Sequence, residues 1–148
     1  MPDFEDDTEG DSEEMKAALV SIPEITVDPD QHFVKKPRYA SEIRNIIACQ
    51  GEFCPGTRSS PHVVQFPGKS SHDEPVFEKL VPRYILYQVH PLASYKAWIL
   101  QLIDGLRFLH SLDIVRRDLR IDNFLFSDDG SRLVICDLES HWGKPAGP

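Results

Sequence analysis

The longest amphipathic pattern in the chain lies between Ser94 and Leu109. Large apolar residues recur there at steps of three and four, which is the spacing of one face of an α-helix. These residues are Tyr95, Trp98, Ile99, Leu102, Ile103, Leu106 and Leu109. Ser94 stands where an N-cap is expected. The pattern predicts a long helix that buries a broad apolar stripe against a core.

Shorter patterns surround this helix. A second helix is predicted after Ser41, because three isoleucines form one stripe that closes at Gly51. Strands are predicted where apolar runs are bounded by Pro, Gly or Asp, namely at 24–27, 32–35, 62–66, 76–81 and 84–89. Residues 124–126 and 133–135 bracket a polar turn and predict a β-hairpin. This order of strands and helices predicts an α+β fold.

The formal net charge of −8 is concentrated at the start of the sequence. Eight acids and no Lys or Arg lie between Met1 and Glu14, whereas the rest of the chain carries sixteen acids and sixteen bases. A block of like charge repels itself and is usually disordered. We expect residues 1–14 to be a disordered acidic tail and residues 15–148 to form one domain.

Several classes of function are excluded by composition. The chain has no basic stripe of the kind that binds nucleic acid, and no apolar run near the ~18 residues of a membrane span. Its acidic start is unlike a secretory signal. The three cysteines are odd in number and show no C-x-x-C spacing, which favours a reducing intracellular compartment, the cytoplasm. The sequence gives no indication of oligomeric state.

Residues suited to phosphate chemistry lie just before and just after the predicted hairpin. The chain reads R-R-D-L-R-I-D-N before it and C-D-L-E after it. Asp118 and Asn123 share one tight loop, and the hairpin folds Asp137 back towards Asn123. Carboxylate and amide oxygens are the ligands that Mg²⁺ prefers, and phosphoryl transfer needs such a metal beside a base.

These motifs resemble the catalytic loop H-R-D-L-x-x-x-N and the D-F-G motif of eukaryotic protein kinases of the serine/threonine type. The preceding stretch G-L-R-F-L-H-S-L-D-I-V looks like the helix that leads into that loop. The resemblance implies that Asp118 is the catalytic base and that Asn123 and Asp137 are magnesium ligands. It also implies that Arg120 is a cation near the γ-phosphate of ATP.

The resemblance implies a nucleotide side as well. Lys35 and Lys36 are candidates for the lysine that holds the ATP phosphates, with Glu42 as its partner. The lysines and Glu42 are closer in sequence than the corresponding residues of the family usually are. An equal alternative is that all three are solvated charges on the surface and not part of a phosphate site. By position only, Val81 and Tyr84 fall at the hinge that grips adenine.

The family pattern is incomplete in this chain. Arg116 replaces the histidine of H-R-D, while Leu138 and Glu139 replace the phenylalanine and glycine of D-F-G. No glycine lies between Gly10 and Gly51, so a glycine-rich phosphate loop is not expected there.

By the same resemblance the domain divides into a small β-rich N-lobe at about 15–90 and the start of a helical C-lobe at about 91–148. The sequence stops at Pro148 without an A-P-E motif. We therefore expect a partial kinase-like domain, truncated after D-L-E, that lacks most of the helical lobe.

Three functions remain open from the sequence. The leading hypothesis is a protein kinase-like transferase that uses ATP and Mg²⁺ to phosphorylate Ser or Thr of a protein. The departures leave the activity of this chain open, so a non-catalytic pseudokinase module that binds a protein partner is an alternative. A second alternative is a small-molecule phosphotransferase, because D-L-R-I-D-N-F-L-F and D-L-E also resemble the aminoglycoside and choline kinases.

Overall fold

The computed structural model describes residues 4–37, 39–53, 58–115, 120 and 123–138. In chain order its elements are α1 (Phe4–Leu19), β1 (His32–Val34), α2 (Ala40–Ala48), β2 (Gly68–Lys69), β3 (Pro75–Glu78), the 3₁₀ helix η1 (Arg83–Tyr87), α3 (Leu92–Ser111), β4 (Phe124–Phe126) and β5 (Leu133–Ile135). Helices and small antiparallel sheets are mixed, which is compatible with a partial kinase-like N-lobe.

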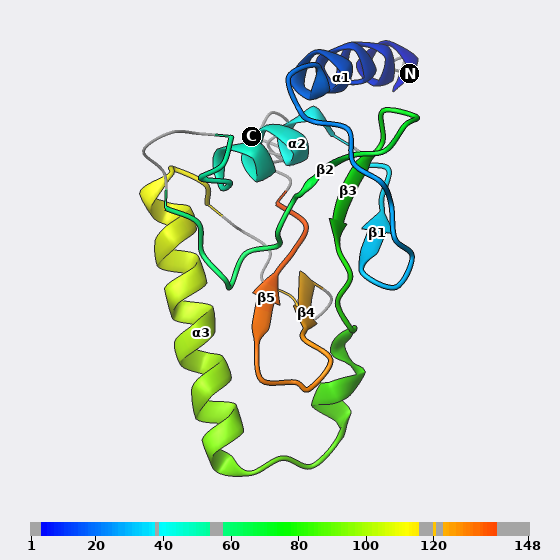
Figure 1. Cartoon of the computed structure of the whole chain (residues 1–148). Helices are drawn as coiled ribbons and strands as arrows, with labels where there is room; N and C mark the ends of the chain where they lie inside the picture. Colours follow the sequence, from blue (N-terminus) through cyan, green and yellow to red (C-terminus); the bar gives the residue numbers. More distant parts are fainter. Residues whose placement is uncertain (1–3, 38, 54–57, 116–119, 121–122, 139–148) are drawn as a thin grey trace.

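Two small antiparallel sheets make up the centre of the molecule (Figure 1). The first has the strand order β1-β3-β2, and Phe33 of β1 faces Phe77 of β3. The second is the predicted hairpin of β4 and β5, which the structure confirms. An antiparallel bridge between Val81 and Phe126 connects the two sheets, with both N–H···O distances at 2.8 Å. The hairpin is therefore held beside the first sheet.

The long helix α3 lies beside β5 along one side of the molecule (Figure 1). It begins at Leu92, after Pro91, rather than at a Ser94 cap. Trp98 anchors the helix, because its indole Nε1 donates a hydrogen bond of 2.7 Å to the Gly130 carbonyl in the hairpin turn. The predicted stripe is only partly buried, since 58% of Ile99 is exposed. None of the helices in the described part of the chain combines the length and apolarity that a membrane crossing requires.

The helix α1 begins at Phe4, inside the segment expected to be a disordered acidic tail. Its C-terminal half contains Glu, Lys, Ala and Leu, which are strong helix formers. Leu19 belongs to the hydrophobic core, and Met15 and Ala18 pack against that core. Tertiary packing at one end thus supports a helix that the charge pattern did not predict. The division of the chain at residue 15 stays a prediction.

Three predicted strands differ in the structure. Residues 24–27 form an isolated parallel bridge between Glu24 and Lys69 of β2 rather than a strand. Residues 84–89 were expected to be extended, but Arg83–Tyr87 form the 3₁₀ helix η1. Pro82, which precedes it, lacks a backbone N–H for a sheet ladder, and the turn buries Ile85 instead. The segment 62–66 has a single parallel bridge, between Val63 and Ile135, because only one short stretch of it runs beside β5.

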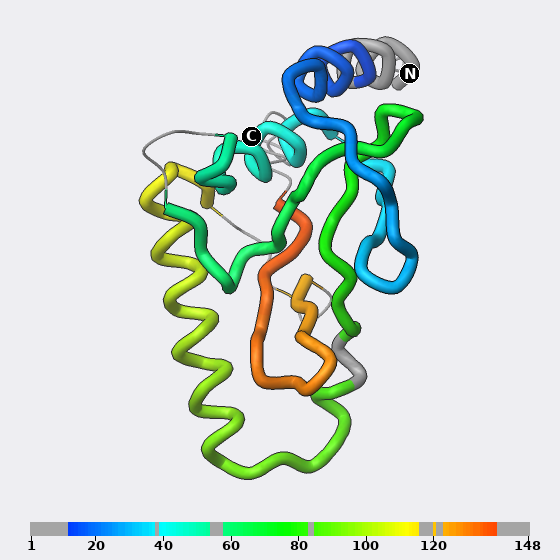
Figure 2. Tube along the Cα trace, in the orientation of Figure 1, coloured from blue at the N-terminus to red at the C-terminus, as the bar shows by residue number. Residues whose placement is uncertain are grey.

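One hydrophobic core joins these parts. Figure 2 follows the chain from α1 across the first sheet, down to the start of α3, and back through the hairpin. Phe66 packs against Phe77 with ring centroids 5.5 Å apart, and Trp98 packs edge-on against Phe126 at 5.3 Å. The core thus extends from α2 and the first sheet to α3, and it holds the pocket residues in place.

Candidate functional site

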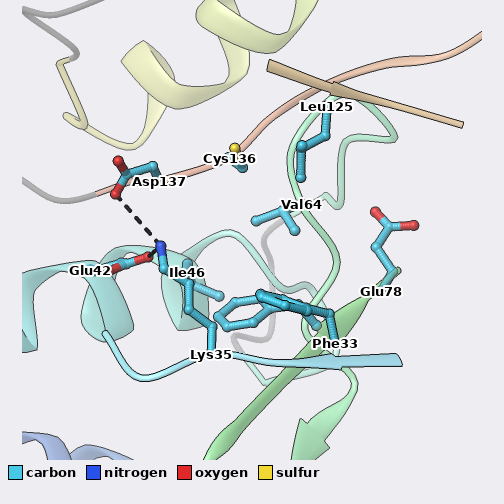
Figure 3. Close-up of a pocket in the computed structure, with 10 residues that line it drawn as sticks. Phe33, Lys35, Glu42, Ile46, Val64, Glu78, Leu125, Cys136 and Asp137 are labelled. Carbon is cyan, nitrogen blue, oxygen red and sulfur yellow. Dashed lines mark hydrogen bonds and ion pairs between the residues drawn. The ribbon is translucent and has the colours of Figure 1, made fainter. Parts of the chain in front are cut away.

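A pocket of about 200 Å³ lies where the first sheet, α2 and the hairpin meet (Figure 3). Its lining residues come from six separate segments and are Phe33, Lys35, Glu42, Ile46, Val64, Phe77, Glu78, Leu125, Cys136 and Asp137. Most of these side chains are apolar. Three charged groups gather at one end of the pocket, and Glu78 lies apart from them (Figure 3). The pocket therefore combines an apolar interior with one charged end.

Lys35 and Glu42 form the ion pair at the charged end. Lys35 Nζ donates a hydrogen bond of 2.8 Å to Glu42 Oε1. Lys35 follows β1 directly, and Glu42 lies in the first turn of α2, where the helix dipole favours a negative charge. The short connection between β1 and α2 therefore brings together two side chains that are seven residues apart in sequence.

Burial makes this pair unusual. Glu42 is 1% exposed and is the only fully buried charged residue in the described part of the chain. A buried carboxylate needs a partner, and Lys35 supplies it. Burial alone would lower the pKa of Lys35, but the hydrogen bond and charge of Glu42, together with the charge of Asp137, outweigh it and raise that pKa. Lys35 is thus held as an ammonium ion inside the pocket.

Asp137 approaches the same ammonium group from the end of β5. Its Oδ1 lies 3.8 Å from Lys35 Nζ. A dashed line marks this ion pair in Figure 3. The φ of 62° at Asp137 is in the left-handed region, which Asp adopts more readily than most residues. The next residue, Leu138, is fully buried, and its carbonyl accepts a hydrogen bond of 2.6 Å from Asn45 Nδ2. This contact with α2 therefore holds the backbone next to Asp137 in place.

Asn123 lies at the other end of the hairpin. Its carbonyl accepts hydrogen bonds from the Cys136 N–H at 2.9 Å and from Cys136 Sγ at 3.1 Å. The fold thus brings Asn123 next to the residue that precedes Asp137, as the hairpin argument expected. Arg120 is exposed, and its carbonyl accepts a hydrogen bond from the Asn123 N–H.

The remaining site predictions have different outcomes. Asp118 lies outside the described residues. Lys36 is exposed and Val81 is used in the bridge to Phe126; among described residues, neither lines the pocket. Tyr84 is part of η1, and its side chain is not described. The hinge expected from position alone stays a prediction.

Sequence reasoning missed most of the apolar lining. Phe33 could have been found, because it lies two residues before Lys35, and alternate residues of a strand share one face. Phe77 and Glu78 lie on β3, next to β1 in the sheet, which the sequence alone did not reveal. Leu125 pairs with Val134 across the hairpin, and this register places Leu125 and Cys136 on the same face of it.

The donor chemistry at the charged end and at Asn123 beside it fits Mg²⁺. Asp137 offers a partly exposed carboxylate and Asn123 an amide oxygen, both hard oxygen ligands. Mg²⁺ often binds through one or two carboxylates plus phosphate oxygens rather than in an all-protein cage. The described residues accordingly contain no cluster of three or more His, Cys, Asp or Glu placed to hold a metal by themselves.

Comparison with known proteins gives partial matches. No protein-family model matches the chain. Cyclin-dependent kinase F-1 of Oryza sativa is 44% identical over 48 residues, which is 32% of this chain and 10% of that protein. Mitogen-activated protein kinase SLT2/MPK1 of Saccharomyces cerevisiae is 32% identical over 91 residues, 58% of this chain and 19% of that protein.

A third relative is serine/threonine-protein kinase crk1 of Schizosaccharomyces pombe. It is 35% identical over 65 residues, which is 43% of this chain and 18% of that protein. The chain thus spans less than a fifth of the length of the curated relatives it matches. These cyclin-dependent and mitogen-activated kinases support a protein kinase-like family for the chain.

Proposed function

We propose that the chain is a protein kinase-like phosphotransferase that binds ATP and Mg²⁺ in this pocket and acts on Ser or Thr of a protein. One observation carries the proposal: the Lys35 ammonium lies between Glu42 and Asp137 at the charged end of an apolar pocket. An ammonium group held in this way can bind phosphate oxygens, and the apolar walls can cover a flat base.

The pocket and the residues near it have different roles in this proposal. A cavity of about 200 Å³ is smaller than the roughly 300–1,000 Å³ of most complete ligand sites. It therefore suits the base of a nucleotide, with the phosphates directed towards Lys35. Asn123 and Asp137 would hold Mg²⁺, which when bound neutralises charge on the phosphates. Asp118 remains the proposed base, by resemblance, and Arg120 the proposed cation near the γ-phosphate. The proposal includes a reducing, cytoplasmic setting.

Thermal unfolding of the purified chain, with and without Mg-ATP, tests nucleotide binding. A ligand at 100 times its dissociation constant adds about 2.7 kcal/mol, which is a rise of roughly 5–10 °C for a chain of this size. We expect such a rise with Mg-ATP and a smaller one with ATP and EDTA. Lys35→Met is the matched variant that should lose the rise. A cooperative transition that Mg-ATP does not move would contradict the proposal.

A non-catalytic module is the second candidate. The contact that favours it is the one between Lys35 and Asp137, since a lysine already held by two carboxylates has less capacity for phosphate. Phosphorylation of a generic basic protein substrate with labelled ATP distinguishes the two. Nucleotide binding without turnover, unchanged by Asp118→Asn, would favour the module.

A further inference from the structure

The position of Glu42 depends on a very short helix. Helix α2 has nine residues, and the side chain of its N-cap residue, Tyr39, makes no capping hydrogen bond. Isolated helices of this length are not stable in water, so α2 needs tertiary packing to exist. Because Glu42 is carried by α2, whatever packs on α2 also decides whether Glu42 reaches Lys35.

Helix α1 is the neighbour that packs on α2. The two helices are in contact, and Figure 1 shows α1 beside α2 at the end of the molecule away from the start of α3. On the surface, Arg44 Nη1 of α2 lies 2.9 Å from Glu14 Oε2 of α1. Inside, Leu19 of α1 belongs to the same core cluster as Ile43 and Ile46 of α2.

The C-terminal end of α1 is itself anchored to the first sheet. The Leu19 carbonyl accepts a hydrogen bond of 3.0 Å from Lys69 Nζ of β2. The chain that follows pairs with the same strand, where Lys69 N–H donates to the Pro23 carbonyl at 3.0 Å and Ile25 N–H donates to the Lys69 carbonyl at 2.9 Å. Helix α1 is therefore anchored at its C-terminal end while it contacts α2.

We propose that α1 is a positioning helix for the nucleotide pocket. By packing on α2 it holds Glu42 against Lys35, so the affinity of the pocket for Mg-ATP depends on a contact outside the pocket. This inference rests on the proposed nucleotide-binding function. It adds that the N-terminal segment controls the affinity of the pocket for the nucleotide. Glu14, Leu19 and Arg44 do not line the pocket, so any effect they have on nucleotide binding is indirect, and the contact of α1 with α2 is the route that we propose.

The first experiment is a charge swap on the full-length chain. Glu14→Arg and Arg44→Glu each place like charges face to face, and each should weaken binding of a fluorescent ATP analogue with Mg²⁺ by about two- to fivefold, the range of an exposed ion pair. The double variant E14R/R44E should restore the wild-type affinity. Glu13→Arg makes the same change of charge on the neighbouring residue of α1 and should leave the affinity unchanged. Equal weakening by Glu13→Arg, or no recovery in the double variant, would overturn the proposal.

The second experiment asks whether α1 acts through Glu42. Leu19→Ala removes the core contact and should weaken nucleotide binding by roughly tenfold, a typical coupling between sites. In a Glu42→Gln background the same substitution should have no further effect, because the link between α1 and the pocket is already broken. If Leu19→Ala weakens binding by the same factor in the Glu42→Gln background as in the wild type, the cause is a general loss of stability, and the positioning role is wrong. If Leu19→Ala does not fold, the charge swap decides.

A third measurement separates this inference from the proposed function. Amide hydrogen exchange in the nucleotide-free chain should show faster exchange in α2, but not in α3, for E14R and R44E. A wild-type chain that does not bind the analogue contradicts the proposed function. A wild-type chain that binds it, with charge variants that neither weaken binding nor speed exchange in α2, contradicts the role of α1 alone.

Discussion

The side-chain amide of Asn45 donates a hydrogen bond of 2.6 Å to the carbonyl oxygen of Leu138, 93 residues further along the chain. Asn45 is on α2 and Leu138 follows Asp137, so this bond connects the two segments that carry the charged end of the pocket. Because Leu138 is fully buried, water does not readily replace the amide. The bond is therefore a structural link between Glu42 and Asp137, both of which contact Lys35.

Removal of this link should lower stability measurably. Asn45→Ala leaves the Leu138 carbonyl without its amide donor, and we expect the free energy of unfolding to fall by about 1–2 kcal/mol. Urea unfolding followed by tryptophan fluorescence measures the change. Lys36→Ala, at an exposed position, is the control and should stay within about 0.5 kcal/mol of the wild type. Equal stability of the two variants would show that the bond contributes nothing.

The Lys35–Glu42 pair gives a second prediction. Lys35→Met leaves a buried carboxylate without its cation, which costs about 3–5 kcal/mol for a fully buried pair. Because the Lys35 side chain is 36% exposed, we expect a smaller loss of about 1–3 kcal/mol in chemical unfolding. The double variant K35M/E42L removes the stranded charge and should recover most of that stability. A double variant less stable than Lys35→Met would contradict this account.

The two faces of α3 should respond very differently to substitution. Trp98 is 5% exposed and donates its indole N–H to Gly130, so Trp98→Ala should cost about 3–5 kcal/mol. Ile99 is the next residue but is 58% exposed, so Ile99→Lys should change stability by less than about 0.5 kcal/mol. Thermal unfolding of both variants is the test. A large loss for Ile99→Lys would mean that α3 is rotated relative to the orientation described.

The sequence patterns identified the elements that local chemistry determines. Helices α2 and α3 follow from three- and four-residue apolar spacing, and the hairpin follows from its polar turn. The pattern could not show that Ile99 stays exposed while Trp98 is buried, because both belong to one stripe, and only the position of β5 decides between them.

The candidate site likewise contains features that the sequence could predict and features that it could not. The closeness of Asp137 and Asn123 could be predicted because a hairpin brings its ends together whatever surrounds it. Lys35 was one of two adjacent lysines, and only the fold shows that it turns inward while Lys36 stays exposed. The apolar lining, such as Phe77, depends on the strand order β1-β3-β2, which a single sequence does not encode locally.

The hairpin turn provides a prediction about pH. Asp129 Oδ1 accepts hydrogen bonds from the backbone N–H and hydroxyl of Ser131 and from the hydroxyl of Ser127, and these lower the pKa of Asp129 to about 2. A carboxyl whose pKa is lower in the folded chain stabilises it above its unfolded pKa of 3.8, and this contribution is lost as the pH falls towards 2. NMR titration should show a midpoint near pH 2 that rises in Ser131→Ala. A midpoint near 4 in the wild type would contradict the turn geometry.

The last prediction concerns magnesium at Asp137. If Asp137 holds Mg²⁺ beside the nucleotide, Asp137→Asn should remove the part of ATP affinity that depends on Mg²⁺, a loss of roughly 10- to 100-fold. Asn tolerates the left-handed backbone region as Asp does, so the φ of 62° does not confound the result.

Asp113→Asn is a matched control for that variant, because Asp113 has a φ of 60°, is exposed and does not line the pocket. Calorimetric titration of ATP with Mg²⁺ and with EDTA measures both variants. We expect the Asp113 variant to retain the full magnesium dependence and the Asp137 variant to bind ATP equally in both buffers. If magnesium still strengthens ATP binding to the Asp137 variant as much as to the wild type, the metal is held by other residues. The interaction of Asp137 with Lys35 is then an ion pair without a metal role.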